Sequence, residues 1–410
     1  MKFSEFENKK VLIVGRGKEG RATEKVLRTM VPTCHITMTD REDGENYLDI
    51  QNDYDIVVRS PGVAPSFITR PYTTPTNIFF ANIKGTVIGV TGTKGKSTTA
   101  TLIHKMLSDA GVTVNLIGNI GKPAIEELLM PADPLMNYVF ELSSYQLEDI
   151  QYSPQISVII NLYPDHMDHH GSLEDYYKSK RHILDHVREE DTYIYNPAFP
   201  LLQQWSTEVH CKTIPYIESL PFDTSASKLI GEHNRDNMRA AITVARLFHI
   251  EDDILHRSIL TFEPLHHRIE PIGTFNGISF YDDAISTTPE STIKAIEALG
   301  NVKTIFLGGL DRGYDFTTLI QTLKTHDVKS IVLFPDSGIK IKEALKQVPD
   351  YQPELFETTH MNMAVQFAYH NTPAGSSCLL STASPSYSLW KNFEEKGDLF
   401  KQYVNQFATR

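Results

Sequence analysis

Cysteine and tryptophan are scarce in this chain of 410 residues, which has three cysteines and two tryptophans. Cys34, Cys211 and Cys378 lie far apart and form no Cys-x-x-Cys pair, so the sequence predicts neither a disulfide framework nor a zinc ribbon. No hydrophobic run is long enough to span a bilayer, and the first ten residues lack the apolar core of a signal peptide. We therefore expect a cytoplasmic protein with no membrane partner.

An excess of positive charge is also missing. The chain has 39 lysines and arginines against 51 aspartates and glutamates, which gives a formal net charge of -12. No basic patch with interleaved aromatic residues is present either, so we expect no nucleic-acid partner. The length predicts several domains at a typical size of about 150 residues each, and three is our expectation.

The stretch from residue 87 to 99, Val-Ile-Gly-Val-Thr-Gly-Thr-Lys-Gly-Lys-Ser-Thr-Thr, predicts a phosphate-binding loop. A hydrophobic run that favours a buried strand precedes the loop and a helical segment follows it, so backbone N–H groups can converge on an anion. Lys96 can reach the terminal phosphates, and the hydroxyl of Ser97 or Thr98 can bind Mg²⁺. The general pattern has a glycine where this chain has Val90, and an ordinary glycine turn before a helix is the alternative. The residues assigned to ATP here are Gly92, Thr93, Lys94, Gly95, Lys96, Ser97 and Thr98.

The N-terminal stretch has the pattern of a dinucleotide-binding βαβ unit. A strand over residues 10–15 leads into Gly15-Arg-Gly-Lys-Glu-Gly20 and a helix over 21–30. A second strand ends at Asp40, which is placed to accept a ribose hydroxyl. NAD is one candidate ligand, and a nucleotide-sugar diphosphate, which needs the same helix N-terminus, is another. The segment is short for a full dinucleotide-binding domain, which favours a ligand smaller than NAD.

The middle of the chain predicts a parallel sheet with polar residues at the strand ends. Strands are expected over residues 114–118, 138–141 and 158–162, separated by helical spacers. Glu141 and Asn161 close two of them and should point toward the phosphate loop, where Glu141 can hold Mg²⁺ or its water. The alternative for Glu141 is that it caps a helix that starts at Ser143.

The segment Asp165-His-Met-Asp-His-His170 is dense in side chains that can bind a metal. Zinc sites usually gather three or four ligands with helical or hairpin spacing, so we do not predict zinc here. His166 can hold a second cation or the substrate, or it can be an ordinary surface histidine. Further along, strands expected over 277–283, 303–307 and 331–334, with helices between them, predict a second doubly wound module.

Eight motifs occur in the order found in the muramyl (Mur) ligases, and the chain resembles that family from about Lys10 to Val404. The motifs are Gly92–Thr98, Gly118–Gly121, Glu141–Leu147, Asp165–Asp168, Tyr176–Lys180, Gly231–Asn237, Leu265–Arg268 and Lys391–Gly397. The resemblance implies an α/β protein of three modules. These are a Rossmann-like domain for the UDP substrate (1–84), a central P-loop domain for ATP (85–270) and a doubly wound Rossmann-like domain for the amino acid (271–410).

The resemblance is strongest to the members that add glutamate, and it implies an ATP-dependent carboxylate-amine ligase. Such an enzyme joins glutamate, D-glutamate in the usual case, to UDP-N-acetylmuramoyl-L-alanine through an acyl phosphate in peptidoglycan precursor synthesis. A member that adds L-glutamate and a folylpolyglutamate synthase-like ligase are the alternatives. The implied partners are small molecules only, with ATP and two Mg²⁺ ions as cofactors, and we expect a monomer.

The resemblance also assigns roles to single residues. Catalysis falls to Lys96, His166, Lys180 and Arg268, and the Mg²⁺ ligands are Ser97, Glu141, His166 and a carbamylated Lys180. The UDP substrate contacts Gly15, Arg16, Gly17, Asp40, Arg41, Ser60, Asn119 and His166. ATP has further contacts with Asn234, Asn237, Arg268 and Asp283. The amino acid contacts Thr287, Arg312, Ser386, Tyr387 and Phe393.

Three departures from the family pattern concern the amino acid. The glutamate-adding members have Asp-Ser-Lys-Ala-Thr-Asn where this chain has Asp-Ala-Ile-Ser-Thr-Thr, so Ile285 replaces a lysine. Arg312 stands in place of a second lysine, and Tyr387 replaces an aliphatic residue. These changes leave the stereochemistry and the identity of the amino acid open. We predict that Arg312 holds its side-chain carboxylate.

Overall fold

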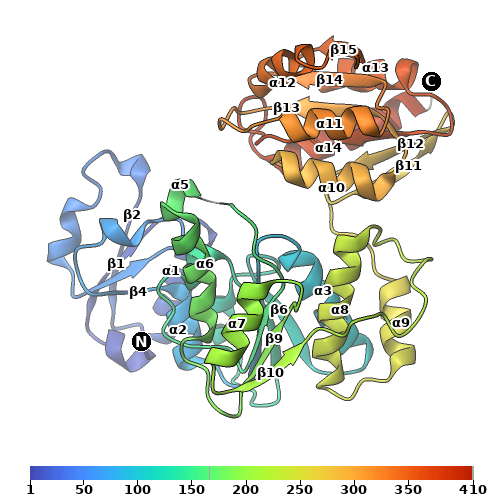
Figure 1. The fold of residues 1–410 in the computed structure, drawn as a ribbon. Helices are drawn as coiled ribbons and strands as arrows, with labels where there is room; N and C mark the ends of the chain where they lie inside the picture. The colour runs from blue at the N-terminus through green and yellow to red at the C-terminus, as the bar shows by residue number, and fades with distance from the viewer. Residues whose placement is uncertain (166, 409–410) are drawn as a thin grey trace. The chain divides into compact units, whose positions relative to one another are not determined.

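The computed structural model describes residues 1–165 and 167–408 and divides the chain into two compact units (Figure 1). The first consists of residues 1–227 and 234–262, and the second consists of residues 228–233 and the chain from 263 onward. The first unit contains two sheets and the second contains one, which confirms the expected α/β class. The second unit resumes at residue 263, and a strand begins at Glu270, while the boundary predicted after residue 270 stays a prediction. The boundary predicted after residue 84 stays a prediction.

The N-terminal sheet has four parallel strands. In spatial order they are β2 (His35–Thr39), β1 (Lys10–Val14), β3 (Ile56–Arg59) and β4 (Tyr72–Thr73). Side chains alternate between the two faces of β1, so Val11 and Ile13 pack in the core with Val26 of helix α1 (Lys18–Met30). Leu12 and Val14 face loop residues on the other side. This sheet is smaller than a full dinucleotide-binding domain, as its sequence indicates.

The second sheet of the first unit is entirely parallel and holds the phosphate loop at its centre. In spatial order its strands are β10 (Lys212–Pro215), β9 (Thr192–Tyr195), β8 (Ile156–Ile159), β5 (Thr86–Thr91), β7 (Asn137–Glu141) and β6 (Val114–Gly118). β5 pairs with both β7 and β8, so the carboxyl ends of these strands meet at one edge. The strand predicted over 158–162 lies at 156–159, because Asn161 turns out of the sheet to bond with the phosphate loop.

Helices connect these strands and place the loops between them. They are α1, α2 (Pro75–Asn82), α3 (Lys96–Asp109), α4 (Ser144–Leu147), α5 (Met167–His170), α6 (Leu173–Arg181), α7 (Pro200–Glu208), α8 (Glu232–Arg246) and α9 (Asp252–Leu260). The hydroxyl of Ser143 caps α4 by accepting a hydrogen bond from the backbone N–H of Gln146. The cap of this helix is therefore Ser143, and Glu141 is left for another role.

The second unit is a doubly wound module. In spatial order its strands are β11 (Glu270–Phe275), β12 (Ile278–Asp282), β16 (Ser377–Leu380), β13 (Val302–Gly308), β14 (Ser330–Phe334) and β15 (Glu354–Glu357). Only the β11–β12 pair is antiparallel. Its helices are α10 (Pro289–Leu299), α11 (Thr317–Thr325), α12 (Ser337–Lys346), α13 (Met361–Asn371) and α14 (Phe393–Ala408). The first three pack on one face of the sheet, with Ile305 in that core, and the last two pack on the other, with Phe306 (Figure 1). This confirms the predicted architecture.

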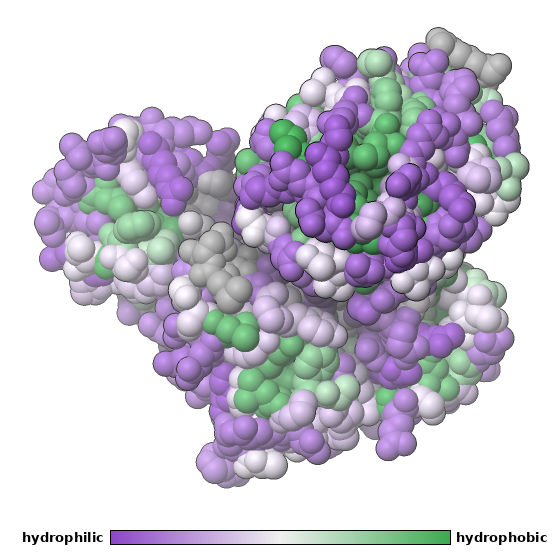
Figure 2. Space-filling view, turned by 45° about the horizontal axis from the view of Figure 1, so that its top comes forward, coloured by the Kyte–Doolittle hydropathy of each residue, from purple (hydrophilic) through white to green (hydrophobic). Residues whose placement is uncertain are grey.

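The surface is largely hydrophilic. On the face shown in Figure 2, hydrophobic residues gather in separate patches surrounded by hydrophilic ones. No helix among residues 1–165 and 167–408 is long and apolar enough to cross a membrane.

Candidate active site

The phosphate loop lies between the end of β5 and the start of α3. Gly95 has a φ of +83°, and a Cβ atom added there would lie 2.4 Å from Oδ1 of Asn237, so only glycine fits without strain. The Lys96 ammonium donates hydrogen bonds to the carbonyl oxygens of Gly92 (3.1 Å) and Thr93 (2.9 Å). The loop therefore curls around its own lysine. Ser97 and Thr98 follow in the buried first turn of α3.

Asn161 holds this loop from the neighbouring strand. Its Oδ1 accepts hydrogen bonds from the backbone N–H groups of Thr93 and Lys94, both at 2.9 Å, and its Nδ2 donates to the carbonyl oxygen of Lys94 at 2.9 Å. The Lys94 ammonium also pairs with Asp165 at 3.1 Å. The contact between Asn161 and the loop agrees with the prediction that it points there.

Asn237, one of the two asparagines assigned to ATP, contacts α3. Oδ1 of Asn237 accepts a hydrogen bond from the hydroxyl of Thr99 at 3.1 Å, and its Nδ2 donates to Oδ1 of Asn234 at 3.0 Å. The structure thus brings Asn234 and Asn237 together beside the phosphate loop. Amide groups there can read the edge of a purine.

Glu141 ends β7, opposite Val90 of β5 and Gly118 of β6. Its side chain is 1% exposed, and one carboxylate oxygen accepts a hydrogen bond from Nδ2 of Asn119 at 3.3 Å. The other oxygen is buried and has no hydrogen-bond partner within the described part of the chain. Leaving a carboxylate oxygen buried and unpaired is costly, and a divalent cation would remove that cost. Glu141 therefore fits a Mg²⁺ ligand.

Lys180 lies on α6 and is 1% exposed. Its ammonium sits 4.6 Å from the centre of the Tyr176 ring. Burial, together with the nearby charge of Lys96, holds the pKa of Lys180 well below its usual value. The side chain is therefore poised to be a neutral amine rather than a solvated cation. His166, predicted as its partner at the metal, lies outside the described residues.

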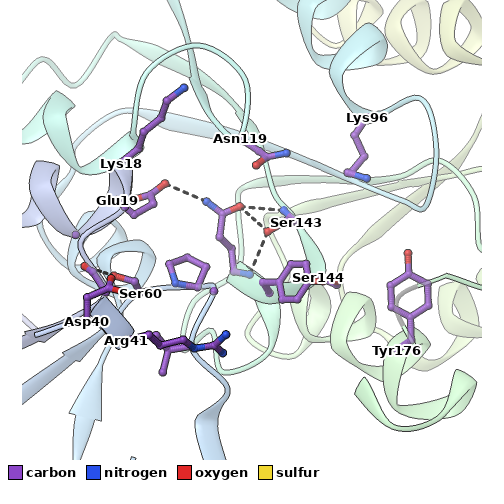
Figure 3. Close-up of a pocket in the computed structure, with 18 of the residues that line it drawn as sticks. Lys18, Glu19, Asp40, Arg41, Ser60, Lys96, Asn119, Ser143, Ser144 and Tyr176 are labelled. Carbon is purple, nitrogen blue, oxygen red and sulfur yellow. Dashed lines mark hydrogen bonds between the residues drawn. The ribbon is translucent and has the colours of Figure 1, made fainter. Parts of the chain in front are cut away.

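A cavity of about 600 Å³ joins the N-terminal sheet to the phosphate loop (Figure 3). The residues that line it and that the sequence assigned to a site are Gly15, Gly17, Asp40, Arg41, Ser60, Lys96, Asn119 and Lys180. A ligand in this cavity can contact the glycine loop before α1 at one end and the two lysines at the other. Glu19 and Gln146, for which we predicted no role, also line the cavity.

Arg16 is an exception among the residues predicted to bind the UDP substrate. Its guanidinium pairs with Asp43 at 2.5 Å and donates to the carbonyl oxygen of Met38 at 3.0 Å, and Arg16 does not line the cavity. Its backbone N–H instead donates to the carboxylate of Asp40 at 2.6 Å. Arg16 thus fixes Asp40 through its backbone, and its predicted contact with the UDP substrate stays a prediction.

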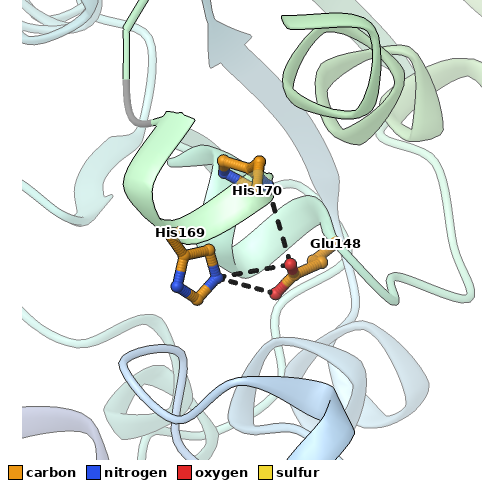
Figure 4. Close-up of side chains that lie close together, drawn as sticks. All are labelled: Glu148, His169 and His170. Atoms are coloured by element: carbon orange, nitrogen blue, oxygen red, sulfur yellow. Dashed lines mark hydrogen bonds and ion pairs between the residues drawn. The ribbon is translucent and has the colours of Figure 1, made fainter. Parts of the chain in front are cut away.

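A buried ion pair that the sequence did not reveal lies beside the cavity. The Arg59 guanidinium, with no exposed side-chain surface, donates to both carboxylate oxygens of Asp149 at 3.1 and 2.7 Å. The neighbouring Glu148 contacts Arg59 at 3.8 Å, His169 at 3.3 Å and His170 at 3.6 Å (Figure 4). Arg59 already supplies positive charge to this carboxylate, so an ion-pair network accounts for the cluster and zinc is not needed.

The residues assigned to the amino acid lie in the second unit. Thr287, Arg312 and Ser386 follow β12, β13 and β16, which are adjacent strands, and a hydrogen bond from the backbone N–H of Leu310 to the carbonyl oxygen of Pro385 (2.8 Å) joins two of their loops. The Ser386 hydroxyl is buried without a partner within the described residues, so it is available to a ligand. Tyr387 is 64% exposed, and Phe393 packs its ring edge-on against His267.

Asp283, predicted to contact ATP, is committed to the interior of the second unit. Its carboxylate accepts hydrogen bonds from the hydroxyl of Ser381 at 2.8 Å and the backbone N–H of Ile269 at 3.3 Å. Burial raises its pKa to about 7. Within the second unit, Asp283 therefore anchors the loop that precedes β11, and its predicted ATP contact stays a prediction. Arg268 lies in that loop, directly before Ile269.

Comparison with known proteins gives consistent matches. A family model described as the Mur ligase middle domain matches residues 90–223. The UDP-N-acetylmuramoylalanine–D-glutamate ligase of Thermoanaerobacter pseudethanolicus is 31% identical, over 98% of this chain and 99% of the relative. The UDP-N-acetylmuramoyl-L-alanine–L-glutamate ligase of Salinispora tropica is 32% identical over the full length of both.

Solved structures agree on the fold. The MurF ligase of Thermotoga maritima in complex with ADP has a TM-score of 0.62 at 13% identity, over 99% of this chain and 97% of that one. The MurC ligase from the same organism has a TM-score of 0.62 at 16% identity, over 98% and 99% of the two chains. With full-length relatives above 30% identity and this fold, the chain belongs to the Mur ligase family of ATP-dependent ligases.

Proposed function

We propose that this protein joins D-glutamate to UDP-N-acetylmuramoyl-L-alanine at the expense of ATP. The observation that carries the proposal is the cavity of about 600 Å³, which runs from a nucleotide-binding glycine loop to Lys96 of the phosphate loop. A nucleotide-linked carboxylate held there would meet ATP at its reacting end. The matches to glutamate ligases along the whole chain support this choice of substrate.

The reaction forms an amide in two steps. A carboxylate oxygen of the substrate attacks the γ-phosphorus of ATP, the bond to the β-phosphate oxygen breaks, and ADP leaves. The amine of glutamate then attacks the acyl carbon, an amide bond forms, inorganic phosphate departs and the amine loses a proton. Negative charge collects on phosphates and carboxylates throughout, so cations and correct placement should supply most of the catalysis. Lys96 is positioned to supply one such charge at the terminal phosphates.

Mg²⁺ would supply further positive charge between the phosphates and the substrate carboxylate when bound. We assign Ser97 and the unpaired carboxylate oxygen of Glu141 to one ion. For the second we assign His166 together with Lys180 in a carbamylated form. A neutral lysine amine is the form that reacts with carbon dioxide, and the lowered pKa of Lys180 favours it. Carbamylation then converts the amine into an anion that can face a metal.

L-glutamate is the second candidate amino acid. Ile285 removes the cation that glutamate-adding members usually carry in this loop, and a relative named for L-glutamate matches over the full length of both chains. Arg312 can hold the side-chain carboxylate of either enantiomer, because a guanidinium can make two parallel hydrogen bonds to a carboxylate. Other residues in the loops after β12 and β16 must then distinguish the D from the L configuration at the α-carbon of glutamate.

The test is phosphate release from ATP with UDP-N-acetylmuramoyl-L-alanine present, with D-glutamate, with L-glutamate and with no amino acid. Turnover with D-glutamate alone supports the proposal and makes Ile285 a tolerated change. Turnover with L-glutamate alone makes the loop over residues 284–288 a specificity determinant and corrects the amino acid. No turnover with either enantiomer refutes the proposed substrate pair.

A further inference from the structure

Glu19 carries a carboxyl group that the proposed chemistry does not use. It lies in the first turn of α1 and lines the cavity, where its Oε1 accepts a hydrogen bond from Nε2 of Gln146 at 3.4 Å (Figure 3). The two residues are 127 positions apart in the chain, so the bond joins the N-terminal sheet to the segment after β7. Burial raises the pKa of Glu19 to about 7.

The amide oxygen of Gln146 also has hydrogen-bond partners. Its Oε1 accepts hydrogen bonds from the backbone N–H of Ser143 and from the hydroxyl of Ser143, both at 3.0 Å. Ser143 lies two residues after Glu141, whose carboxylate accepts from Asn119. A chain of hydrogen bonds therefore runs from the first turn of α1 to the backbone segment that carries Glu141.

Charge alone does not explain a glutamate at this position. The N-terminus of α1 and its glycine loop are the part of the cavity suited to a diphosphate, and a carboxylate there repels one. The charged groups around Glu19 include Glu126, which adds negative charge and pairs with Lys25 at 3.4 Å, and Lys18, the adjacent residue, which lines the same cavity. The first turn of α1 favours a carboxylate in itself, and the contact with Gln146 gives Glu19 a link to a distant segment as well.

We propose that Glu19 is a positioning residue that fixes the amide of Gln146 and thereby couples binding of the nucleotide substrate to the placement of the Glu141–Ser144 segment. This inference rests on the proposed function, because it takes the nucleotide-linked carboxylate as the ligand of the cavity. Without Glu19 the Nε2 group of Gln146 loses this acceptor, and the amide is held only at its Oε1 end by Ser143. The nucleotide substrate then binds to a less ordered site.

The experiment compares Glu19→Ala, Glu19→Gln and a control, Glu24→Ala, in the full-length enzyme. Glu24 lies on the same helix, but it pairs with Arg28 at an exposed site. We expect Glu19→Ala to raise the KM for UDP-N-acetylmuramoyl-L-alanine about tenfold, the value of one hydrogen bond to an ionisable group, with the KM for ATP unchanged. Glu19→Gln should stay within about threefold of the wild type, because its amide oxygen can still accept from Gln146, and the control should match the wild type.

A double-variant comparison separates positioning from simple loss of structure. If Glu19 acts through Gln146, adding Glu19→Ala to Gln146→Ala has no further effect on the KM for the nucleotide substrate. If the KM effects of the two single variants multiply in the double variant, the inference is overturned. It is also overturned if Glu19→Ala leaves this KM unchanged or lowers it, or if Glu19→Gln raises it as much as Glu19→Ala does. A wild-type enzyme that shows no turnover with this substrate would instead refute the proposed function, so the two failures are distinguishable.

Discussion

The pair formed by Arg59 and Asp149 should respond asymmetrically to mutation. The Arg59 side chain has no exposed surface, whereas the Asp149 side chain is 21% exposed. Asp149→Ala leaves a buried guanidinium whose remaining partners include Glu148 at 3.8 Å, the Tyr72 ring and backbone carbonyl oxygens. Removing one partner of a buried pair costs roughly 3–5 kcal/mol, and since Glu148 still offsets part of this, we expect about 3 kcal/mol.

Arg59→Met should cost less. It fills the buried site with an apolar side chain of similar length, and the Asp149 carboxylate left behind can still contact water. We expect a loss of about 1–2 kcal/mol, because a partly hydrated charge is less costly than a buried one. Arg59 directly precedes Ser60, which lines the nucleotide cavity, so both variants should also raise the KM for the nucleotide substrate.

The two tryptophans make the measurement possible. Trp205 lies on α7 in the first unit and Trp390 lies in the second, so Trp390→Phe leaves a single fluorescence reporter for the unit that contains the pair. In this background, urea unfolding gives the denaturation midpoint of each variant. A shift of the midpoint with an unchanged m-value reports a change in the free energy of unfolding. Two results would refute this explanation. One is that Arg59→Met lowers the urea midpoint at least as much as Asp149→Ala does, and the other is that neither variant changes the midpoint.

Three further predictions concern the reaction itself. Lys96→Ala should abolish ATP turnover, measured as phosphate release, because it removes the ammonium around which the loop curls; retained turnover would show that the phosphate loop is misassigned. Lys180→Ala should be inactive and partly rescued by a short carboxylic acid that takes the place of the carbamate, whereas full activity without the acid would make Lys180 a structural residue. Arg312→Ala should raise the KM for glutamate at least tenfold and leave the KM for the nucleotide substrate unchanged, and a normal KM for glutamate would exclude Arg312 as the side-chain contact.

Local sequence signals were sufficient for most of the fold. β1, β2 and β6 lie on stretches with strand-favouring residues that end at glycine or aspartate. The phosphate loop is marked by a strand that is followed by glycines and then by a helix. The carboxyl ends of adjacent parallel strands lie at one edge, so the sequence could also place Glu141 and Asn161 near that loop. The strand before Asn161 ends at Ile159, earlier than predicted, where the Asn161 side chain begins to bond with the loop.

Contacts between distant parts of the chain could not be predicted from local sequence signals. Arg59 and Asp149, or Glu19 and Gln146, are ordinary polar residues until the fold brings them together. Arg16 and Asp283 sit at positions where the family pattern predicts ligand contacts, yet each has internal partners that satisfy its charged group. The direction of a side chain depends on such competing partners, and the sequence alone does not show them.

The central claim is that ATP activates a substrate carboxylate as an acyl phosphate. It is tested most directly with UDP-N-acetylmuramoyl-L-alanine labelled with ¹⁸O in its carboxylate, incubated with ATP, Mg²⁺ and the glutamate enantiomer that supports turnover. Each phosphate released should carry one ¹⁸O atom, because a carboxylate oxygen leaves with the phosphoryl group when the amine attacks. Phosphate without ¹⁸O, released at the rate of amide formation, would contradict it.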